Sequence, residues 1–430
     1  MAEQMKPSGI DWIGDIPKSW KVTRLQTLFD QVKDKNSGTK EKNLLSLSYG
    51  KIVKKDIEGA FGLIPESFDT YNIIKKNDIV LRLTDMQNDQ VSLRTGLVKE
   101  EKGIITSAYV TIRLRFGSPS YYHWYLYAFD TSKQIYAFGQ GVRQSLTFEE
   151  LKKMLILLPS PKEQQAIADF LDEECAQIDS IAADLEKQIV LLQQYKKSLI
   201  TETVTKGLDK SAPMKDSGVE WIGKIPEHWQ KTRIKFEASI IGSGTTPDSG
   251  NSMYYDNGEH SWIQSGDLYG KDYIYETEKQ LTNLAILECH ALNWYTKDFV
   301  VVAMYGASVG NVAISKIDSF TNQACCVIKL NEKNDNRYLF YFLKAAQEEM
   351  LLKAFGGTQP NISQIIIKNL NFLNVPLLEQ IEIADFLDSK CDMINEMLKS
   401  KKDQYDILIK HKKSLIYEYV TGKKRVKEVQ

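Results

Sequence analysis

The chain is one unit written twice, and this internal repeat constrains its fold more than any other feature. The segment SGIDWIGDIPKSWKVTR at 8–24 returns as SGVEWIGKIPEHWQKTR at 217–233, identical at 10 of 17 positions. Further along, IADFLD occurs at 167–172 and 383–388, and KKSLI occurs at 196–200 and 412–416. A tandem duplication of this extent predicts two similar units related by a pseudo-twofold axis.

Each copy divides into a globular part and a helical part. The globular parts, near 8–150 and 217–365, mix short apolar runs with Gly, Asn and Ser, a pattern typical of strands and loops. We expect strands at 79–83, 110–114, 299–304 and 327–330, and short helices at 121–129 and 337–344. The segment 206–216 has the composition of a linker between the two copies.

The helical part of the first copy, 161–205, contains neither Gly nor Pro after Pro161. Apolar residues recur there at seven-residue intervals, at Leu171, Ile178, Leu185, Leu192 and Leu199. The second copy keeps this series at Leu387, Ile394, Leu408 and Leu415, with Lys401 in the middle. The spacing predicts two long helices packed as an antiparallel pair. The alternative is that each helix only covers its own globular part.

Composition favours a soluble, reduced, cytoplasmic protein without a membrane segment. Of 430 residues, 43% are hydrophobic and 26% charged, no long uncharged apolar stretch occurs, and the N-terminus lacks the hydrophobic region of a signal peptide. Five irregularly spaced cysteines do not suggest a disulfide framework. The net charge of −1 means that any DNA binding must use local basic patches.

Motifs for catalysis or metal binding are missing from the sequence. The nearest approach to a phosphate-binding loop is Gly218-x4-Gly223-Lys224, but Ile225 stands where Ser or Thr is required, and the first copy has Asp15 in place of the lysine. The five histidines form no pair at metal-ligand spacing. We therefore predict no catalytic residue, no metal site and no cofactor bound by this chain.

Three motifs in order resemble the specificity subunits of type I restriction–modification systems. They are WIGxIPxxW at 12–20 and 221–229, GGTQPNIS at 356–363, and EQxxIAxFLD at 163–172 and 379–388. The resemblance covers essentially the whole chain. It implies an α+β fold in which two mixed α/β target recognition domains are separated by two long helices packed as an antiparallel coiled coil. The implied boundaries are 1–155 and 211–372 for the recognition domains, and 156–210 and 373–430 for the helices.

The resemblance also implies a function. In that family each recognition domain reads one half of a split double-stranded DNA site, and the helices set the gap and dock two modification subunits. Those subunits carry S-adenosylmethionine and methylate adenine, while restriction subunits use ATP and Mg for translocation and cleavage. The chain itself would be non-catalytic.

Candidate DNA-contacting residues are polar side chains in loops where the two copies disagree, since Gln and Asn suit adenine, Arg suits guanine, and Ser, Thr and Lys suit phosphates. Residues shared by both copies, such as Trp20 and Trp229, are expected to hold the fold. In the first domain the candidates are Tyr49, Lys51, Lys54, Lys55, Arg82, Thr84, Gln87, Asn88, Arg94, Thr95, Ser107, Tyr109, Gln140, Arg143, Gln144 and Ser145. In the second they are Ser243, Thr245, Thr246, Gln264, Ser265, Asp267, Tyr305, Ser308, Asn322, Gln323, Thr358, Gln359 and Asn361.

Arginine is scarce, with nine in the chain, and it is unevenly divided. Outside the repeated motif the first domain has Arg82, Arg94, Arg113, Arg115 and Arg143, whereas the second has Arg337. This bias predicts that guanine reading by arginine is concentrated in the half-site of the first domain.

Two other classes of protein remain to be weighed. A nuclease or methyltransferase fused to a recognition domain is disfavoured, because the sequence has no Asn-Pro-Pro-aromatic motif and no cofactor-binding glycine motif. A scaffold or silent-allele subunit that only bridges partner proteins is disfavoured by two intact, unequal globular parts, although the helices alone would suit that role.

Overall fold

The computed structural model describes residues 4–55, 67–86, 93–137, 145–306, 308–355 and 360–426. The chain forms two units, each built from one globular part and segments of both long helices. Unit 1 comprises Met1–Glu186 with Lys402–Gln430, and unit 2 comprises Lys187–Lys401. The boundary between the units falls within both long helices, α4 (Pro161–Lys206) and α10 (Leu377–Val420).

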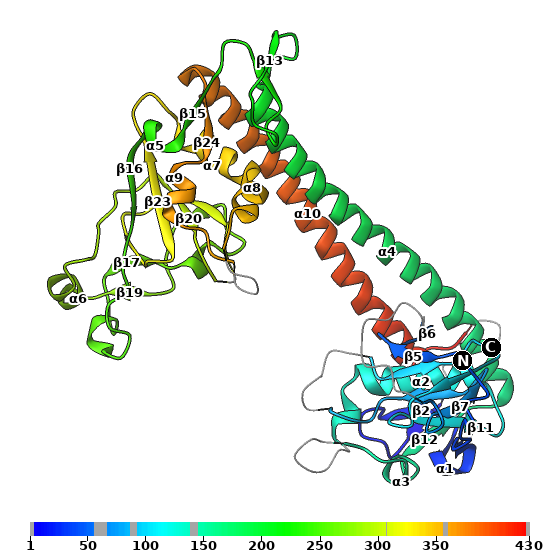
Figure 1. Ribbon diagram of the computed structural model, residues 1–430. Helices are drawn as coiled ribbons and strands as arrows, with labels where there is room; N and C mark the ends of the chain where they lie inside the picture. The colour runs from blue at the N-terminus through cyan, green and yellow to red at the C-terminus, as the bar shows by residue number, and fades with distance from the viewer. Residues whose placement is uncertain are drawn as a thin grey trace. The chain divides into compact units, whose positions relative to one another are not determined.

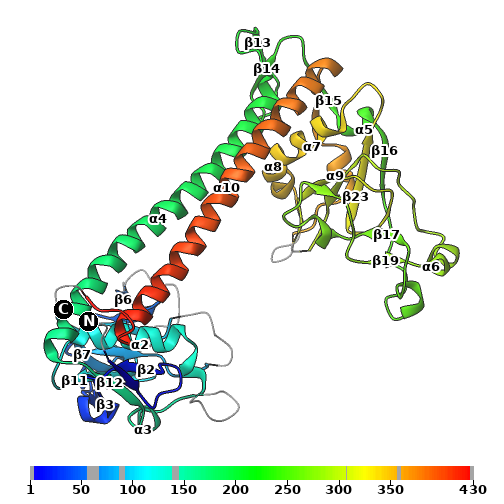
Figure 2. The same cartoon turned by 180° about the vertical axis from the view of Figure 1, so that it is seen from behind.

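Unit 1 is built on a four-stranded antiparallel sheet in the order β4-β11-β8-β9, covered by helix α2 (Figures 1 and 2). Ser118 caps α2 by accepting a hydrogen bond from the Tyr121 amide, and Tyr121, Tyr122 and Tyr125 bury that helix against the core. Three strand pairs, β1-β2, β5-β6 and β7-β10, complete the unit. A fourth pair, β3-β12, joins the beginning of the globular part to its end. The elements are β1 (Met5–Pro7), β2 (Asp15–Pro17), β3 (Lys21–Arg24), α1 (Leu25–Leu28), β4 (Phe29–Gln31), β5 (Leu45–Ser48), β6 (Lys51–Lys54), β7 (Asn72–Lys75), β8 (Ile79–Leu81), β9 (Thr95–Leu97), β10 (Lys102–Ile105), β11 (Val110–Leu114), α2 (Pro119–Thr131), η1 (Gln134–Ala137), α3 (Phe148–Leu151) and β12 (Leu155–Leu158).

Unit 2 contains a five-stranded sheet in the order β16-β23-β20-β21-β18 and a three-stranded sheet in the order β19-β17-β22. Helix α7 packs Tyr338, Leu339 and Phe342 into the core beside strand β20. Two short pairs, β13-β14 and β15-β24, repeat the β1-β2 and β3-β12 pairs of unit 1. The elements are β13 (Met214–Asp216), β14 (Lys224–Pro226), β15 (Gln230–Arg233), α5 (Ile234–Glu237), β16 (Ala238–Ser243), η2 (Ser252–Tyr254), β17 (His260–Ile263), η3 (Ser265–Leu268), β18 (Tyr273–Ile274), β19 (Gln280–Leu281), α6 (Asn283–Glu288), β20 (Phe299–Ala303), β21 (Val312–Ser315), β22 (Phe320–Thr321), β23 (Cys325–Leu330), α7 (Asn336–Ala345), α8 (Gln347–Leu352), α9 (Gln364–Lys368) and β24 (Asn371–Asn374).

The strands and short helices expected in the globular parts are all present, with shifted ends. The antiparallel helix pair is also confirmed within each unit (Figure 1). In unit 1 the rings of Phe170 and Tyr419 lie 4.5 Å apart, and the Lys412 ammonium donates to Asp179 at 2.6 Å. In unit 2 Lys196 donates to Asn395 at 2.8 Å. The second and third of these contacts occupy equivalent positions of the repeat.

The helices also contribute residues to the cores of the globular parts. The alternative interpretation, that each long helix covers a globular part, is therefore correct for the ends of the helices. Leu171, Cys175 and Ile178 of α4 lie in the core of unit 1, and Ile383, Leu387 and Cys391 of α10 lie in that of unit 2. Burial raises the pKa of the Cys175 thiol to about 12, which leaves it an inert packing group.

Repeated residues join each globular part to the helices through the same hydrogen bonds. The Trp20 indole donates to Glu163 at 3.0 Å, and the Trp229 indole donates to Glu379 at 2.8 Å. The phenol of Tyr121 donates to the Val420 carbonyl and that of Tyr338 to the Val204 carbonyl, each at 3.0 Å. Each unit therefore holds the start of one long helix and the end of the other.

Asp172 and Asp388, the last residues of the two IADFLD motifs, make a second set of equivalent contacts. Asp172 accepts hydrogen bonds from Ser120 and from the Trp124 indole at 2.8 Å. Asp388 accepts from Tyr341 at 2.7 Å, Tyr273 at 3.0 Å and Arg337 at 2.9 Å. The repeated aspartate thus anchors the globular part of each unit to the long helix that begins in that unit, through partners that differ between the units.

Candidate nucleic-acid interface

The predicted DNA-contacting residues fall into four groups in the structure. Some lie outside the described residues: Gln87, Asn88, Gln140, Arg143, Gln144, Thr358 and Gln359. Exposed residues are Tyr49, Lys51, Lys54, Lys55, Ser107, Ser145, Gln323 and Asn361. Partly buried residues are Arg82, Thr84, Tyr109, Ser243, Thr245, Thr246, Gln264, Ser265 and Tyr305. Buried residues are Arg94, Thr95, Asp267, Ser308 and Asn322.

In unit 1 the β5-β6 hairpin gathers four of the exposed candidates. Its turn requires positive φ at Tyr49 (47°) and Gly50 (77°), which fits a tight hairpin turn between the paired strands. Tyr49 at the turn is 82% exposed, and Lys51, Lys54 and Lys55 follow it. An exposed aromatic ring on the same hairpin as three lysines suits stacking and phosphate contacts with DNA. Of these lysines, Lys51 has its ammonium 3.9 Å from the Asp179 carboxylate.

The hairpin is held by its apolar residues. Leu47 and Ile52 pack with Tyr109 against the small core of Leu45, Ile74, Val80, Val98 and Ile105. Because Tyr109 lies on the loop after β10, this packing brings the Ser107–Tyr109 candidates toward the hairpin. Sequence comparison of the two copies named both segments, and in the structure both pack on the same small core.

The prediction that Arg94 contacts DNA is wrong, because its side chain is fully buried and cannot reach DNA. Its guanidinium donates to the carbonyl oxygens of Arg82 at 3.2 Å, Thr84 at 2.9 Å and Asp85 at 3.2 Å, and to the Tyr136 hydroxyl at 3.1 Å. Arg94 therefore positions the loop that carries the candidates Arg82 and Thr84. Thr95 follows it into β9 and is buried as well.

Two further arginines of unit 1 are engaged by carboxylates. Arg113 makes a two-point contact with Asp78, at 2.7 and 2.8 Å, and this hydrogen bonding raises its pKa. Arg115 makes the same kind of contact with Asp30. The arginine bias of the first domain is thus partly structural, and the prediction of guanine reading there no longer extends to Arg94, Arg113 and Arg115.

In unit 2 the parallel pairing of two short strands brings two glutamines to one edge. Trp262 pairs with Phe320 and Ile263 with Thr321, so β17 and β22 end together. Gln264 is the next residue after β17, and Asn322 and Gln323 follow β22. The Asn322 amide donates to the Ile263 carbonyl at 3.0 Å, which continues the pairing to this point. Gln264 and Gln323 therefore leave the sheet at the same edge, hereafter the glutamine edge.

A third candidate, Thr246, is fixed beside the glutamine edge by the loop that carries it. The carbonyl of Ser243 accepts hydrogen bonds from Asn293 at 3.0 Å and the Tyr295 hydroxyl at 3.1 Å. The Thr245 carbonyl accepts from the Trp262 indole at 3.3 Å. Gly244 lies so close to β22 that a Cβ there would sit 1.7 Å from the Thr321 carbonyl oxygen. Only glycine permits this approach.

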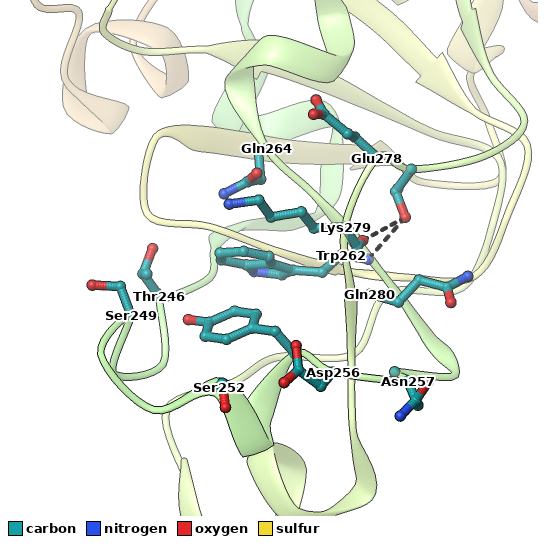
Figure 3. Close-up of a pocket in the computed structure, with 13 residues that line it drawn as sticks. Thr246, Ser249, Ser252, Asp256, Asn257, Trp262, Gln264, Glu278, Lys279 and Gln280 are labelled. Carbon is teal, nitrogen blue, oxygen red and sulfur yellow. Dashed lines mark hydrogen bonds between the residues drawn. The ribbon is translucent and has the colours of Figure 1, made fainter.

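Figure 3 shows the pocket at this edge, a hollow of about 730 Å³. The side chains of Gln264 and Lys279 point toward each other on one side of the Trp262 indole (Figure 3). The wall also contains amides, hydroxyls and two carboxylates, a mixture able to meet both donors and acceptors on base edges. The lining residues are Thr246, Ser249, Ser252, Tyr255, Asp256, Asn257, Gly258, Trp262, Gln264, Thr277, Glu278, Lys279 and Gln280.

Three buried candidates of unit 2 have internal roles. The Asp267 carboxylate accepts from the amides of Gln264 at 2.8 Å and Glu278 at 3.2 Å, which ties the two sides of the pocket together. The Asn322 side chain accepts from the Ala324 amide at 3.0 Å and shapes the turn into β23. Ser308 is 6% exposed. Asp267 and Asn322 therefore position the interface from within.

Tyr305 and Asn361 meet in an isolated β-bridge of unit 2. Asn361 also exchanges backbone hydrogen bonds with Phe355, at 2.7 and 2.9 Å, so the two ends of the GGTQPNIS loop are closed. The Asn361 side chain is exposed there. Among the described residues that line the pocket, neither Tyr305 nor Asn361 occurs.

Sequence reasoning missed several residues of the pocket, among them Asn257, Lys279, Gln280 and Tyr255. They lie on loops and a two-residue strand with no periodicity and no counterpart in the first copy. Their proximity to Gln264 depends on the β17-β19 pairing, which joins His260 to Leu281 and Ser261 to Gln280. A pairing of two residues leaves no signal in a single sequence.

The described residues show neither a candidate metal site nor a candidate membrane-spanning helix. Within the described ranges, His, Cys, Asp and Glu side chains do not gather in groups of three that could bind a metal ion. The helices of those ranges lack a segment with the length and hydropathy needed to cross a bilayer.

Comparison with known proteins agrees with the fold. The type I restriction enzyme MjaVIII specificity subunit of Methanocaldococcus jannaschii is 24% identical over 427 residues, covering 96% of this chain and 95% of that protein. The MjaIX specificity subunit of the same organism is 31% identical over 193 residues, 44% of this chain and 43% of that protein.

A solved structure from a study of complex assembly and conformational transition of the type I R-M system has the same fold. It superimposes with a TM-score of 0.70 at 14% identity, covering 94% of this chain and 98% of that one. The family described as type I restriction modification DNA specificity domain matches residues 17–190 and 226–404, once in each copy of the repeat. The chain belongs to this family and is a specificity subunit of type I restriction–modification systems.

Proposed function

We propose that this specificity subunit reads an asymmetric, split DNA site, with one unit on each half. The observation that carries the proposal is that the two units share a frame, meaning the hydrogen bonds that join each globular part to the long helices, but carry different candidate surfaces. The Trp–Glu and Tyr–carbonyl contacts are the same in both units. The candidate surfaces differ: unit 1 offers a hairpin with Tyr49 and three lysines, and unit 2 offers the glutamine edge. Two unlike surfaces on like frames suit two unlike half-sites.

The chemistry of each surface indicates how it would contact DNA. The lysines of the β5-β6 hairpin would neutralise phosphates and contribute affinity that falls as salt rises. The amides of Gln264 and Gln323 would contact base edges in the major groove and contribute sequence preference. An arginine contact to guanine is expected from Arg143, which lies outside the described residues.

The partners of this chain are a further part of the proposal. Two modification subunits would dock on the long helices, carry S-adenosylmethionine and methylate adenine, and restriction subunits would use ATP and Mg. In unit 2 both helices expose large apolar side chains, with Leu191 and Tyr195 on α4 and Met393 and Met397 on α10 between 52% and 57% exposed. The Lys196–Asn395 contact joins these two groups. Such exposed apolar side chains support protein docking, and this chain would act in the cytoplasm without catalysing a reaction.

A scaffold that only bridges partner proteins is the competing function, and the match of the DNA specificity domain to both copies does not favour it. The test is selection of random duplex DNA by the complex of this chain with its modification subunit, in excess nonspecific competitor. The proposal predicts enrichment of two short fixed sequences at a fixed separation. A scaffold would retain no competitor-resistant sequence, and that outcome would refute the proposal.

A further inference from the structure

We infer that Gln323 reads a guanine in the half-site of unit 2, with its amide held in one orientation by Thr246. The inference rests on the proposed function and deepens it by assigning a base to one residue. Its basis is a hydrogen bond in which the Thr246 hydroxyl donates to Gln323 Oε1 at 2.5 Å.

This hydrogen bond determines which half of the Gln323 amide faces away from Thr246. A free glutamine can donate from Nε2 and accept at Oε1, which matches the N7 acceptor and N6 donor of adenine. With Oε1 turned toward the Thr246 hydroxyl, the other end of the amide, Nε2 with its two hydrogens, is the group turned away from Thr246 and toward DNA. Among the described residues, Nε2 of Gln323 has no hydrogen-bond partner, and the side chain is exposed.

Two N–H donors without an acceptor suit guanine. Guanine presents two acceptors in the major groove, O6 and N7, whereas adenine would leave its N6–H group facing no acceptor, and cytosine would oppose donor to donor. A buried donor without a partner is penalised, so the amide discriminates against adenine and cytosine as well as favouring guanine.

Thr246 can hold the amide because both residues stand on a rigid support. Gly244 packs against the Thr321 carbonyl, two residues before Gln323, and no larger residue fits there. Beyond Thr246, the Pro247 carbonyl accepts a hydrogen bond from the Tyr255 hydroxyl at 2.6 Å. On the other strand, the amide of Asn322 is bonded to Ile263 at 3.0 Å. The hydroxyl and the amide therefore meet between two fixed backbones, in the manner of a preorganised contact.

The test compares methylation maps of the complex with its modification subunit, formed by the wild type and three variants. Thr246→Val removes the hydroxyl at nearly constant size, so the amide can turn and also accept from adenine. One position of the half-site should broaden from G to G or A, with the wild-type preference of roughly ten- to a hundredfold falling to within a few fold. Thr246→Ser keeps the hydroxyl and should retain the wild-type motif.

Gln323→Glu replaces the two donors by acceptors at the same shape. Guanine should be rejected at that position while the other half-site stays unchanged, and melting temperatures of all variants should match the wild type. The inference is overturned if Thr246→Val and Gln323→Glu leave every position unchanged, or if Gln323→Glu weakens all sequences equally, as loss at a phosphate contact would. A wild type without any split motif would instead refute the proposed function itself, and this inference with it.

Discussion

Replacing Gly244 by alanine should weaken base discrimination in the half-site of unit 2 while leaving the fold and unit 1 intact. The new Cβ would lie 1.7 Å from the Thr321 carbonyl oxygen and 2.5 Å from its carbonyl carbon. Contacts closer than 3.0 Å are essentially never seen, so the loop and strand must separate by about 1.3 Å, and neither atom can rotate away because both are backbone. Overpacking of this kind costs about 1–3 kcal/mol.

The displacement has a larger effect on recognition than on stability. In the wild type, Thr246 Oγ1 lies 2.5 Å from Gln323 Oε1. A shift above 1 Å breaks this hydrogen bond and moves one wall of the pocket. A side chain that no longer reaches its base gives up about 1–3 kcal/mol of discrimination at that position. Gly266→Ala is the matched control, because a Cβ at Gly266 meets no atom within 4 Å.

The assay is binding of the complex with its modification subunit to duplexes that carry single base changes in each half-site, with thermal melting as the check on folding. For Gly244→Ala we expect discrimination to weaken in one half-site and to persist in the other, whereas Gly266→Ala should behave as the wild type. Equal discrimination in both half-sites by Gly244→Ala would refute the reasoning that this close approach positions the glutamine edge.

Three further predictions concern single residues. Arg94→Met should lower the free energy of unfolding of unit 1 by about 2–4 kcal/mol in urea titrations, because three carbonyl groups lose their donor; an unchanged midpoint would contradict this. Burial, with the charges of Lys99 and Lys412, lowers the pKa of His123 to about 4. Because the unfolded chain then binds a proton at higher pH than the folded chain does, the free energy of unfolding should fall as the pH drops from about 6.5 to 4, by up to about 3 kcal/mol. His123→Gln should flatten that part of the curve, and an unchanged slope would count against it. Arg143→Ala should cost about 1–3 kcal/mol at one base position of the first half-site, measured by binding to single-base variants, and an equal loss on all sequences would make it a phosphate contact.

Much of the fold could be predicted because its signals are local and repeated. The heptad series that begins at Leu171 lies on α4, Pro161–Lys206, close to the expected 161–205, and the series that begins at Leu387 lies on α10, Leu377–Val420. The shared tryptophans mark the frame, since Trp20 and Trp229 are both fully buried. A duplicated sequence separates frame from surface, because residues needed for the same packing stay alike while those for different half-sites do not.

The candidate interface was less predictable because polarity in a loop does not reveal what the side chain contacts. Arg94 and Arg82 look alike in sequence, yet Arg94 is fully buried among carbonyl groups and Arg82 is partly exposed. Asp267 has the sequence surroundings of a polar loop residue, but its carboxylate caps two backbone amides. The pairing of Thr246 with Gln323 joins residues 77 positions apart in the sequence. Only the chain's path in space distinguishes these cases.

The central claim is that one chain reads a split site through two different units, and a methylation map tests it most directly. The chain would be co-expressed with its modification subunit, and methylated adenines in the host DNA would be located by long-read sequencing. The account predicts a single new motif of two short, unlike, defined sequences around an undefined gap of fixed length. No new methylation from an assembled complex, or a continuous motif without a gap, would contradict it.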